Sequence, residues 1–221
     1  MKKACIFDLD GTLADTVESI ARAVNRGLAH FGYDARPVNE YKYYAGDGLN
    51  VAFLRALRRA GDADGRCLEE GIPLVRQWLA QEALYHVKPY PGITDTLAKL
   101  KKMGFCLAVL SNKPHRQAVQ VSETLFGPGY FDRIQGQTDQ FKPKPDPACA
   151  LWLANELGVS CGDCLYVGDT DTDMRTGNRA GMRTVGVTWG FRERKELEEN
   201  GAEKIIQKPE ELLLLAEELL H

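Results

Sequence analysis

Four short apolar segments recur along the chain, and polar residues or glycine follow each of them. They are residues 4–7, 106–110, 164–167 and 184–187. Segments this short and this continuously apolar are typical of strands buried on both faces. Helical patterns separate them, at residues 94–103, 115–126 and 147–157. Because alternating strands and helices favour βαβ units, the pattern predicts an α/β fold with a doubly wound, Rossmann-like parallel sheet.

Residues 15–88 break this alternation. They contain helical patterns at 17–31, 51–60 and 74–87 but no convincing strand. Since both ends of the stretch lie beside the expected active edge of the sheet, we predict a helical cap domain at 15–88, inserted into a core domain formed by residues 1–14 and 89–221. The segment Lys88-Pro89-Tyr90-Pro91-Gly92 would return the chain to the core, because proline and glycine stiffen and turn the backbone.

The composition limits which binding partners and which cellular compartment we expect. Of 221 residues, 44% are hydrophobic and 27% charged, which is an ordinary globular balance. The net charge of −3 gives no support for nucleic acid or an anionic membrane as a partner. No apolar run has the length of a membrane span, and we expect no signal peptide. Six scattered cysteines are too few for a disulfide scaffold. We therefore expect a reduced, cytoplasmic protein, either a monomer or a homodimer.

The first apolar segment ends in Asp8-Leu9-Asp10-Gly11-Thr12. Residues i and i+2 of a strand share a face, so both carboxylates can reach one volume at the carboxyl edge of the sheet, where open α/β sheets bind ligands. Two like charges this close need a proton or a cation between them. The pair therefore predicts a metal site, with an N-capping aspartate and a turn aspartate as the alternative.

Three further polar groups follow later apolar segments or lie between them. Residues 111–114 combine a hydroxyl with a helix start, which suits an anion or is an ordinary cap. Residues 141–146 hold two lysines, each followed by a proline, which suits a phosphate or is a solvated loop. Residues 169–173 contain three aspartates, a candidate cation site, with helix capping as the alternative. Asp169 and Asp173 have the spacing that places two side chains on one helical face.

In this order, the four groups resemble the motifs of the haloacid dehalogenase superfamily of phosphohydrolases, in the class with a helical cap after the first motif. The family pattern Lys-Pro-x-Pro-Asp aligns with Lys142, and Lys144 is the alternative. The segments 111–113 and 184–191 are most similar to the phosphoglycolate phosphatase branch, as is Gly46-Asp47-Gly48. The matching motif positions are Asp8, Asp10, Gly11, Thr12, Ser111, Lys142, Gly168, Asp169 and Asp173.

The resemblance implies hydrolysis of a small phosphorylated metabolite through an aspartyl phosphate, with Mg²⁺ as cofactor. Asp8 would be the nucleophile, Asp10 the general acid and base, and Lys142 a ligand of the phosphoryl group. The implied metal-binding residues are Asp8, the backbone carbonyl of Asp10, and Asp169, with Asp173 behind them to order a bound water or the lysine. The implied phosphate- or substrate-binding residues are Thr12, Tyr44, Gly46, Ser111, Asn112 and Lys113.

Several activities share these motifs. We expect 2-phosphoglycolate as the first substrate, with residues 43–49 of the cap selecting it. A pyrophosphatase, a nucleotidase, a sugar phosphatase and a phosphoglucomutase-like phosphotransferase are the alternatives. A receiver-type signalling module would also use an acidic metal site and a lysine, but the cap and Asp10 argue against it. Four intact motifs argue against a catalytically silent protein.

Overall fold

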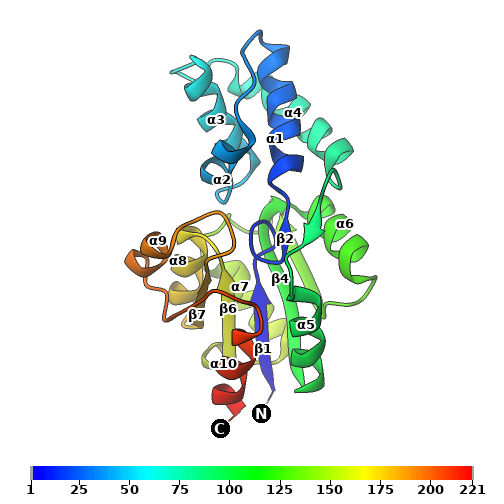
Figure 1. The fold of residues 1–221 in the computed structure, drawn as a ribbon, viewed down its shortest axis with the longest axis vertical. Coiled ribbons are helices and arrows are strands. Elements are labelled where there is room, and N and C mark those ends of the chain that lie inside the picture. Colours follow the sequence, from blue (N-terminus) through cyan, green and yellow to red (C-terminus); the bar gives the residue numbers. More distant parts are fainter. Residues whose placement is uncertain (1, 221) are drawn as a thin grey trace.

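The computed structural model describes residues 2–220 and contains a six-stranded parallel sheet in the order β5-β4-β1-β6-β7-β8 (Figure 1). This confirms the predicted doubly wound α/β fold. The strands are β1 (Lys3–Phe7), β4 (Phe105–Pro114), β5 (Arg133–Gln137), β6 (Cys164–Gly168), β7 (Arg183–Val187) and β8 (Lys204–Ile206). The four strands expected from apolar segments are β1, β4, β6 and β7, and they form the centre of the sheet.

Strand β1 is buried on both faces because helices cover the sheet on each side. Cys5 and Phe7 pack into one hydrophobic cluster, while Ala4 and Ile6 pack into another on the opposite face. On the first face lie α5 (Ile93–Lys102), α6 (His115–Phe126) and α10 (Glu211–Leu220). On the second lie α7 (Ala148–Leu157) and α8 (Asp171–Arg179), and α9 (Arg194–Glu199) packs beside β7 and β8. Alternate side chains of β1 therefore pack into two hydrophobic clusters, one on each face of the sheet.

The helices between residues 17 and 82 form a separate unit above the carboxyl ends of the strands (Figure 1). Along α1, the buried Ile20, Val24 and Leu28 recur every four residues and so form one apolar stripe. This stripe packs around Phe53 in a hydrophobic cluster that is distinct from the two clusters of the sheet. The elements are α1 (Val17–His30), η1 (Val38–Glu40), α2 (Tyr41–Tyr44), α3 (Leu49–Ala60) and α4 (Leu68–Glu82).

A short two-stranded ribbon joins this unit to the sheet. Strand β2 (Ala14–Asp15) pairs antiparallel with β3 (Lys88–Pro89), so the outgoing and returning chains run side by side. The predicted boundaries at 14/15 and 88/89 fall on this ribbon. The division into core and cap domains stays a prediction, which the separate hydrophobic clusters support.

Two strands and one helix start differ from the sequence prediction. Strand β5 is rich in polar residues, and β8 has only three residues, so neither has a continuous apolar pattern. Helix α4 begins at Leu68 and continues through Pro73, whereas the pattern predicts a start after that proline. Over residues 2–220, no helix combines the length and apolar character needed to cross a membrane.

Candidate active site

Asp8 and Asp10 lie at the carboxyl end of β1 and line one pocket, as the strand geometry predicts. The backbone N–H of Asp8 donates to the carbonyl of Val167 at 2.9 Å, which continues the β1–β6 pairing to the edge of the sheet. The chain then turns sharply at Gly11, whose φ is +92°. A Cβ at Gly11 would lie 2.2 Å from Asp169 Oδ2, so only glycine allows the turn to approach this carboxylate.

Three buried carboxylates converge beside this turn. Oxygens of Asp8, Asp169 and Asp173 all lie within 4.8 Å of one another. Asp169 is fixed from two sides, because Oδ1 accepts from Thr12 Oγ1 at 2.8 Å and Oδ2 accepts from the N–H of Phe191 at 2.7 Å. These bonds hold the Asp169 side chain in one orientation toward the other two acids.

Asp173 belongs to the first turn of α8, where it completes a capping box. Thr170 is the N-cap residue: its N–H and Oγ1 donate to Asp173 Oδ2 at 3.1 and 2.7 Å. Asp169 precedes the helix. The expectation that Asp169 and Asp173 share one helical face is therefore wrong, and the tight turn before α8 brings them together instead.

Lys144 is the lysine of this site. Its Nζ lies 2.9 Å from Asp8 Oδ1 and 2.7 Å from Asp173 Oδ1, and it donates to the carbonyl of Leu110 at 3.1 Å. The Lys144 side chain is only 3% exposed, whereas Lys142 is exposed on the same loop. The prediction that Lys142 holds this position is wrong, and the alternative, Lys144, occupies it.

The amide of Asn112 explains why the loop presents Lys144. Asn112 Oδ1 accepts from the N–H of Lys144 at 2.8 Å, and Nδ2 donates to the Lys144 carbonyl at 3.1 Å. The two bonds fix the Lys144 backbone against the end of β4. The expectation that Asn112 binds phosphate or substrate stays a prediction, and Asn112 does line the pocket. Its side chain also organises the loop that carries the lysine.

The charge balance of this cluster fits a divalent cation. Burial raises the pKa of Asp8 from 3.8 to about 7; Lys144 opposes this rise and Asp173 adds to it. Burial also raises the pKa of Asp169 well above its ordinary value, with Asp173 and Asp8 contributing. Burial would lower the pKa of Lys144, but its two aspartate partners outweigh that effect and raise it well above normal. Three buried carboxylates thus lie beside one ammonium group, which pairs with Asp8 and Asp173.

Asp8 Oδ1 gives this fit a geometric basis. It lies within ion-pair distance of Lys144, yet no donor among the described residues is aligned to form a hydrogen bond with it. A buried carboxylate oxygen without a hydrogen bond is costly unless another partner is present. Oxygen ligands of this kind are those that Mg²⁺ prefers.

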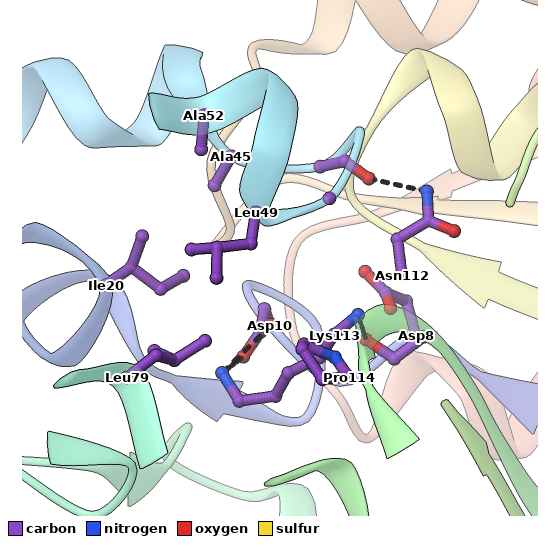
Figure 2. Close-up of a pocket in the computed structure, with 13 residues that line it drawn as sticks. Asp8, Asp10, Ile20, Ala45, Leu49, Ala52, Leu79, Asn112, Lys113 and Pro114 are labelled. Atoms are coloured by element: carbon purple, nitrogen blue, oxygen red, sulfur yellow. Dashed lines mark hydrogen bonds and ion pairs between the residues drawn. The ribbon is translucent and has the colours of Figure 1, made fainter. Parts of the chain in front are cut away.

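The second group of polar residues lies on an irregular end of β4. The β4–β5 register shifts between Leu110 and Pro114, and in this stretch Ser111 Oγ accepts from the N–H of Lys113 at 3.2 Å. Lys113 Nζ reaches Asp10, at 3.0 Å from Oδ1 and 3.3 Å from Oδ2 (Figure 2). The Lys113 side chain is 1% exposed and that of Asp10 is 15% exposed, so the ion pair is largely shielded from solvent.

The pocket above these residues has a polar floor from the core and an apolar roof from the helical unit. Its free space, part of it open to solvent, is about 420 Å³. Figure 2 shows Ile20 and Leu49 above Asp10 and the end of Lys113, with Leu79 beside them. The lining residues are Asp8, Asp10, Ile20, Ala45, Gly46, Gly48, Leu49, Ala52, Leu79, Ser111, Asn112, Lys113 and Pro114.

Two residues expected to contact substrate lie elsewhere. The Thr12 hydroxyl is fully buried and donates to Asp169, so it positions that carboxylate. Tyr44 is buried in the helical unit, where its hydroxyl donates to Glu40, and it does not line the pocket. Both expectations are corrected by the same fact: each hydroxyl already donates to a carboxylate outside the pocket lining. Gly46, in contrast, does line the pocket.

Three core side chains hold the loop that ends α2 and leads into α3. Sequence reasoning found Asn112 but missed Thr172 and Arg192. Thr172 belongs to the acidic motif, and Arg192 directly follows the segment 184–191, so both lay next to detected signals. The bonds are Asn112 Nδ2 to Gly46 O at 3.0 Å, Thr172 Oγ1 to Asp47 Oδ1 at 2.7 Å, and Arg192 Nη2 to Ala45 O at 2.9 Å.

Known proteins share this sequence pattern and fold. The model of the haloacid dehalogenase-like hydrolase family matches residues 5–187. The chain is 31% identical over 220 residues to phosphoglycolate phosphatase 1 of Pseudomonas aeruginosa, covering 99% of this chain and 81% of that protein. It is 34% identical over 189 residues to the phosphoglycolate phosphatase of Aquifex aeolicus, covering 86% of each.

Solved structures agree with this assignment. A protein from Lactobacillus delbrueckii subsp. bulgaricus, provisionally described as a phosphoglycolate phosphatase, superposes with a TM-score of 0.91 at 30% identity, covering 98% of this chain and 99% of that one. CbbY from Rhodobacter sphaeroides, solved in complex with phosphate, gives a TM-score of 0.80 at 26% identity and 96% coverage of each chain.

The parallel sheet, with its acids and lysine gathered at the strand ends, is that of a hydrolase, and the chain belongs to the haloacid dehalogenase-like family. Within the family it lies in the phosphoglycolate phosphatase-like branch. The protein is a phosphatase, an enzyme that hydrolyses phosphoric monoesters.

Proposed function

We propose that this phosphatase is Mg²⁺-dependent, that Asp8 carries the phosphoryl group as an aspartyl phosphate, and that 2-phosphoglycolate is its first substrate. One observation supports the mechanism above all others. Asp8 is a buried pocket-lining carboxylate with an oxygen lacking a hydrogen bond, and two further carboxylates and Lys144 lie against it. The names of the relatives support the substrate.

The donor set suits Mg²⁺, which prefers oxygen ligands and keeps several waters. Asp8, Asp169 and the backbone carbonyl of Asp10 would hold the ion. Both oxygens of Asp173 are already engaged, by Lys144 and by Thr170, so Asp173 would support the lysine from behind. When bound, the ion would neutralise the charge that builds up between the carboxylates and the phosphoryl oxygens.

The protein residues divide the remaining work. Asp8 attacks phosphorus, and the ester oxygen leaves with the alcohol, which splits one difficult hydrolysis into two steps. Lys144 and Ser111 hold the phosphoryl oxygens, since positioning and electrostatics contribute most to such transfers. Asp10 donates a proton to the leaving alcohol and then accepts one from the attacking water. General acid–base assistance of this kind is worth about 10²- to 10⁴-fold.

The size of the pocket favours a small substrate. Much of its free space is open to solvent, and the cavity itself has a volume of only about 40 Å³, well below the about 300–1,000 Å³ that is usual for pockets of drug-sized ligands. The apolar roof closes over the floor and leaves little room beyond the phosphoryl group. The phosphate complex of CbbY supports a phosphate site in this fold.

The test is a panel of phosphomonoesters, measured as kcat/KM for phosphate release with Mg²⁺. We expect 2-phosphoglycolate to lead the panel and Asp8→Asn to abolish turnover. Asp10→Asn should still form some phospho-enzyme, detectable by acid quench and mass spectrometry, but release little phosphate. Lys142→Met, on the exposed part of the lysine loop, is the matched control and should keep full activity. Full activity of Asp8→Asn would overturn the mechanism. A tenfold preference for sugar phosphates or pyrophosphate would overturn the substrate.

A further inference from the structure

We propose that Lys113 recognises a carboxylate of the substrate, and that the pocket thereby selects phosphomonoesters of short hydroxy acids over neutral esters of the same size. This inference rests on the proposed function, because it assigns a role within the same pocket. It concerns the end of the substrate away from the phosphoryl group.

The position of Lys113 carries the argument. Figure 2 draws 13 residues that line the pocket, and among these Lys113 alone has a positively charged side chain. Its Nζ lies beneath Ile20 and Leu49 and beside Leu79, on the side away from Asp8 (Figure 2). A phosphoryl group bound at Asp8 and Ser111 would therefore turn its substituent toward this ammonium.

The hydrogen bonds of Lys113 leave capacity for another anion. A lysine ammonium has three donors. Asp10 accepts two bonds from Nζ, at 3.0 and 3.3 Å, and among residues 2–220 no third acceptor bonds to it. The side chain is 1% exposed, so bulk water has little access to the remaining donor. A buried donor without a partner is costly, and a substrate carboxylate would relieve that cost.

The surroundings strengthen the preference for negative charge. The apolar roof lowers the local dielectric, so an ion pair formed under it is stronger than in water. Helix α3 begins at the same pocket, with Gly48 as its N-cap residue, and no side chain caps it. The first N–H groups of a helix have no partner within the helix and carry its partial positive charge. Lys113 remains the principal feature, and the helix end adds to it.

The competing role for Lys113 is to hold Asp10 alone. Removal of the lysine would then slow every ester equally, since every leaving alcohol needs the same proton. Carboxylate recognition instead predicts a loss confined to substrates that carry the carboxylate. The ratio between matched charged and neutral ligands separates the two roles.

Binding tests the inference without turnover. The probes are 3-phosphonopropionate and propylphosphonate, which cannot be hydrolysed and differ only in the carboxylate. With Mg²⁺-loaded protein in a titration calorimeter, we expect the wild type to bind the carboxylate ligand at least tenfold more tightly. Lys113→Met should reduce this preference to within about twofold, whereas Lys113→Arg should retain part of it. An unchanged preference in Lys113→Met, with its fold checked by thermal unfolding, overturns the inference.

Kinetics separate this inference from the proposed function. The ratio of kcat/KM for 2-phosphoglycolate to that for ethyl phosphate should fall at least tenfold in Lys113→Met and stay unchanged in the exposed control Lys142→Met. Equal losses on both esters overturn carboxylate recognition while the phosphatase mechanism stands. If neither ester is hydrolysed but the binding preference depends on Lys113, the proposed substrate fails while the carboxylate site stands.

Discussion

Asp8→Asn should stabilise the protein at neutral and alkaline pH when no metal is bound. In the folded state, burial raises the pKa of Asp8 from 3.8 to about 7. The unfolded chain therefore loses this proton at lower pH than the folded protein does. As the pH rises from about 4 to about 7, this group progressively destabilises the folded state, and above pH 7 the full penalty is present. Asparagine cannot ionise and avoids the penalty.

The magnitude follows from the difference of about three pKa units, which corresponds to about 4 kcal/mol once both states are fully ionised. Between pH 5 and pH 8, the stability of the variant relative to the wild type should grow by about 3 kcal/mol. Mg²⁺ should reverse the order at pH 8, because the wild type gains a cation beside its ionised carboxylate and the variant gains less.

The assay is urea unfolding at pH 5 and pH 8, in EDTA and in Mg²⁺, followed by circular dichroism. Asp34→Asn is the control, since it neutralises an exposed aspartate of the helical unit. Parallel pH profiles for wild type and Asp8→Asn in EDTA would refute the reasoning. So would a variant that is less stable than the wild type at pH 8 without metal.

Three other changes test the site. Lys144→Met leaves two buried carboxylates without their cation and should cost about 3 kcal/mol of unfolding free energy and all activity, whereas Lys142→Met should change neither. Gly11→Ala forces a Cβ to within 2.2 Å of Asp169 and should weaken Mg²⁺ binding at least tenfold by calorimetry. Thr172→Val removes a 2.7 Å hydrogen bond between the core and the helical unit and should raise KM by a larger factor than it lowers kcat. A fall in kcat by the same factor as the rise in KM would contradict a positioning role.

The sheet was predictable where burial is symmetrical. Strands β1, β4, β6 and β7 have helices on both faces or strands on both sides. Their sequences therefore consist mainly of apolar residues. The edge strand β5 needs little apolar surface, and its sequence Arg133-Ile-Gln-Gly-Gln has no strand pattern. Strand β8 is too short for any period to show. These strands form because β4 and β7 offer them free edges.

The site was predictable as a set of strand ends but not in every side chain. Lys142 and Lys144 are each followed by a proline, and the motif pattern Lys-Pro-x-Pro-Asp aligns with Lys142 rather than with the lysine that enters the site. The choice is made by Asn112, which lies 32 residues earlier and bonds both backbone groups of Lys144. The prediction for Tyr44 failed for a similar reason. Its hydroxyl donates to Glu40 within the helical unit, a contact that depends on how that unit packs. Contacts between distant segments carry this information.

The paired strands β2 and β3 make the helical unit exchangeable in principle. The outgoing and returning chains are hydrogen-bonded neighbours. The inserted helical unit therefore leaves and re-enters the core at adjacent positions, as a surface loop does. The closure entropy of a loop rises only slowly with its length, so the sheet is nearly indifferent to what is inserted. A different helical unit grafted at this ribbon would bring a new roof to the pocket. Asp8, Lys144 and Lys113 would remain behind, so the core would keep its cluster of carboxylates and lysines.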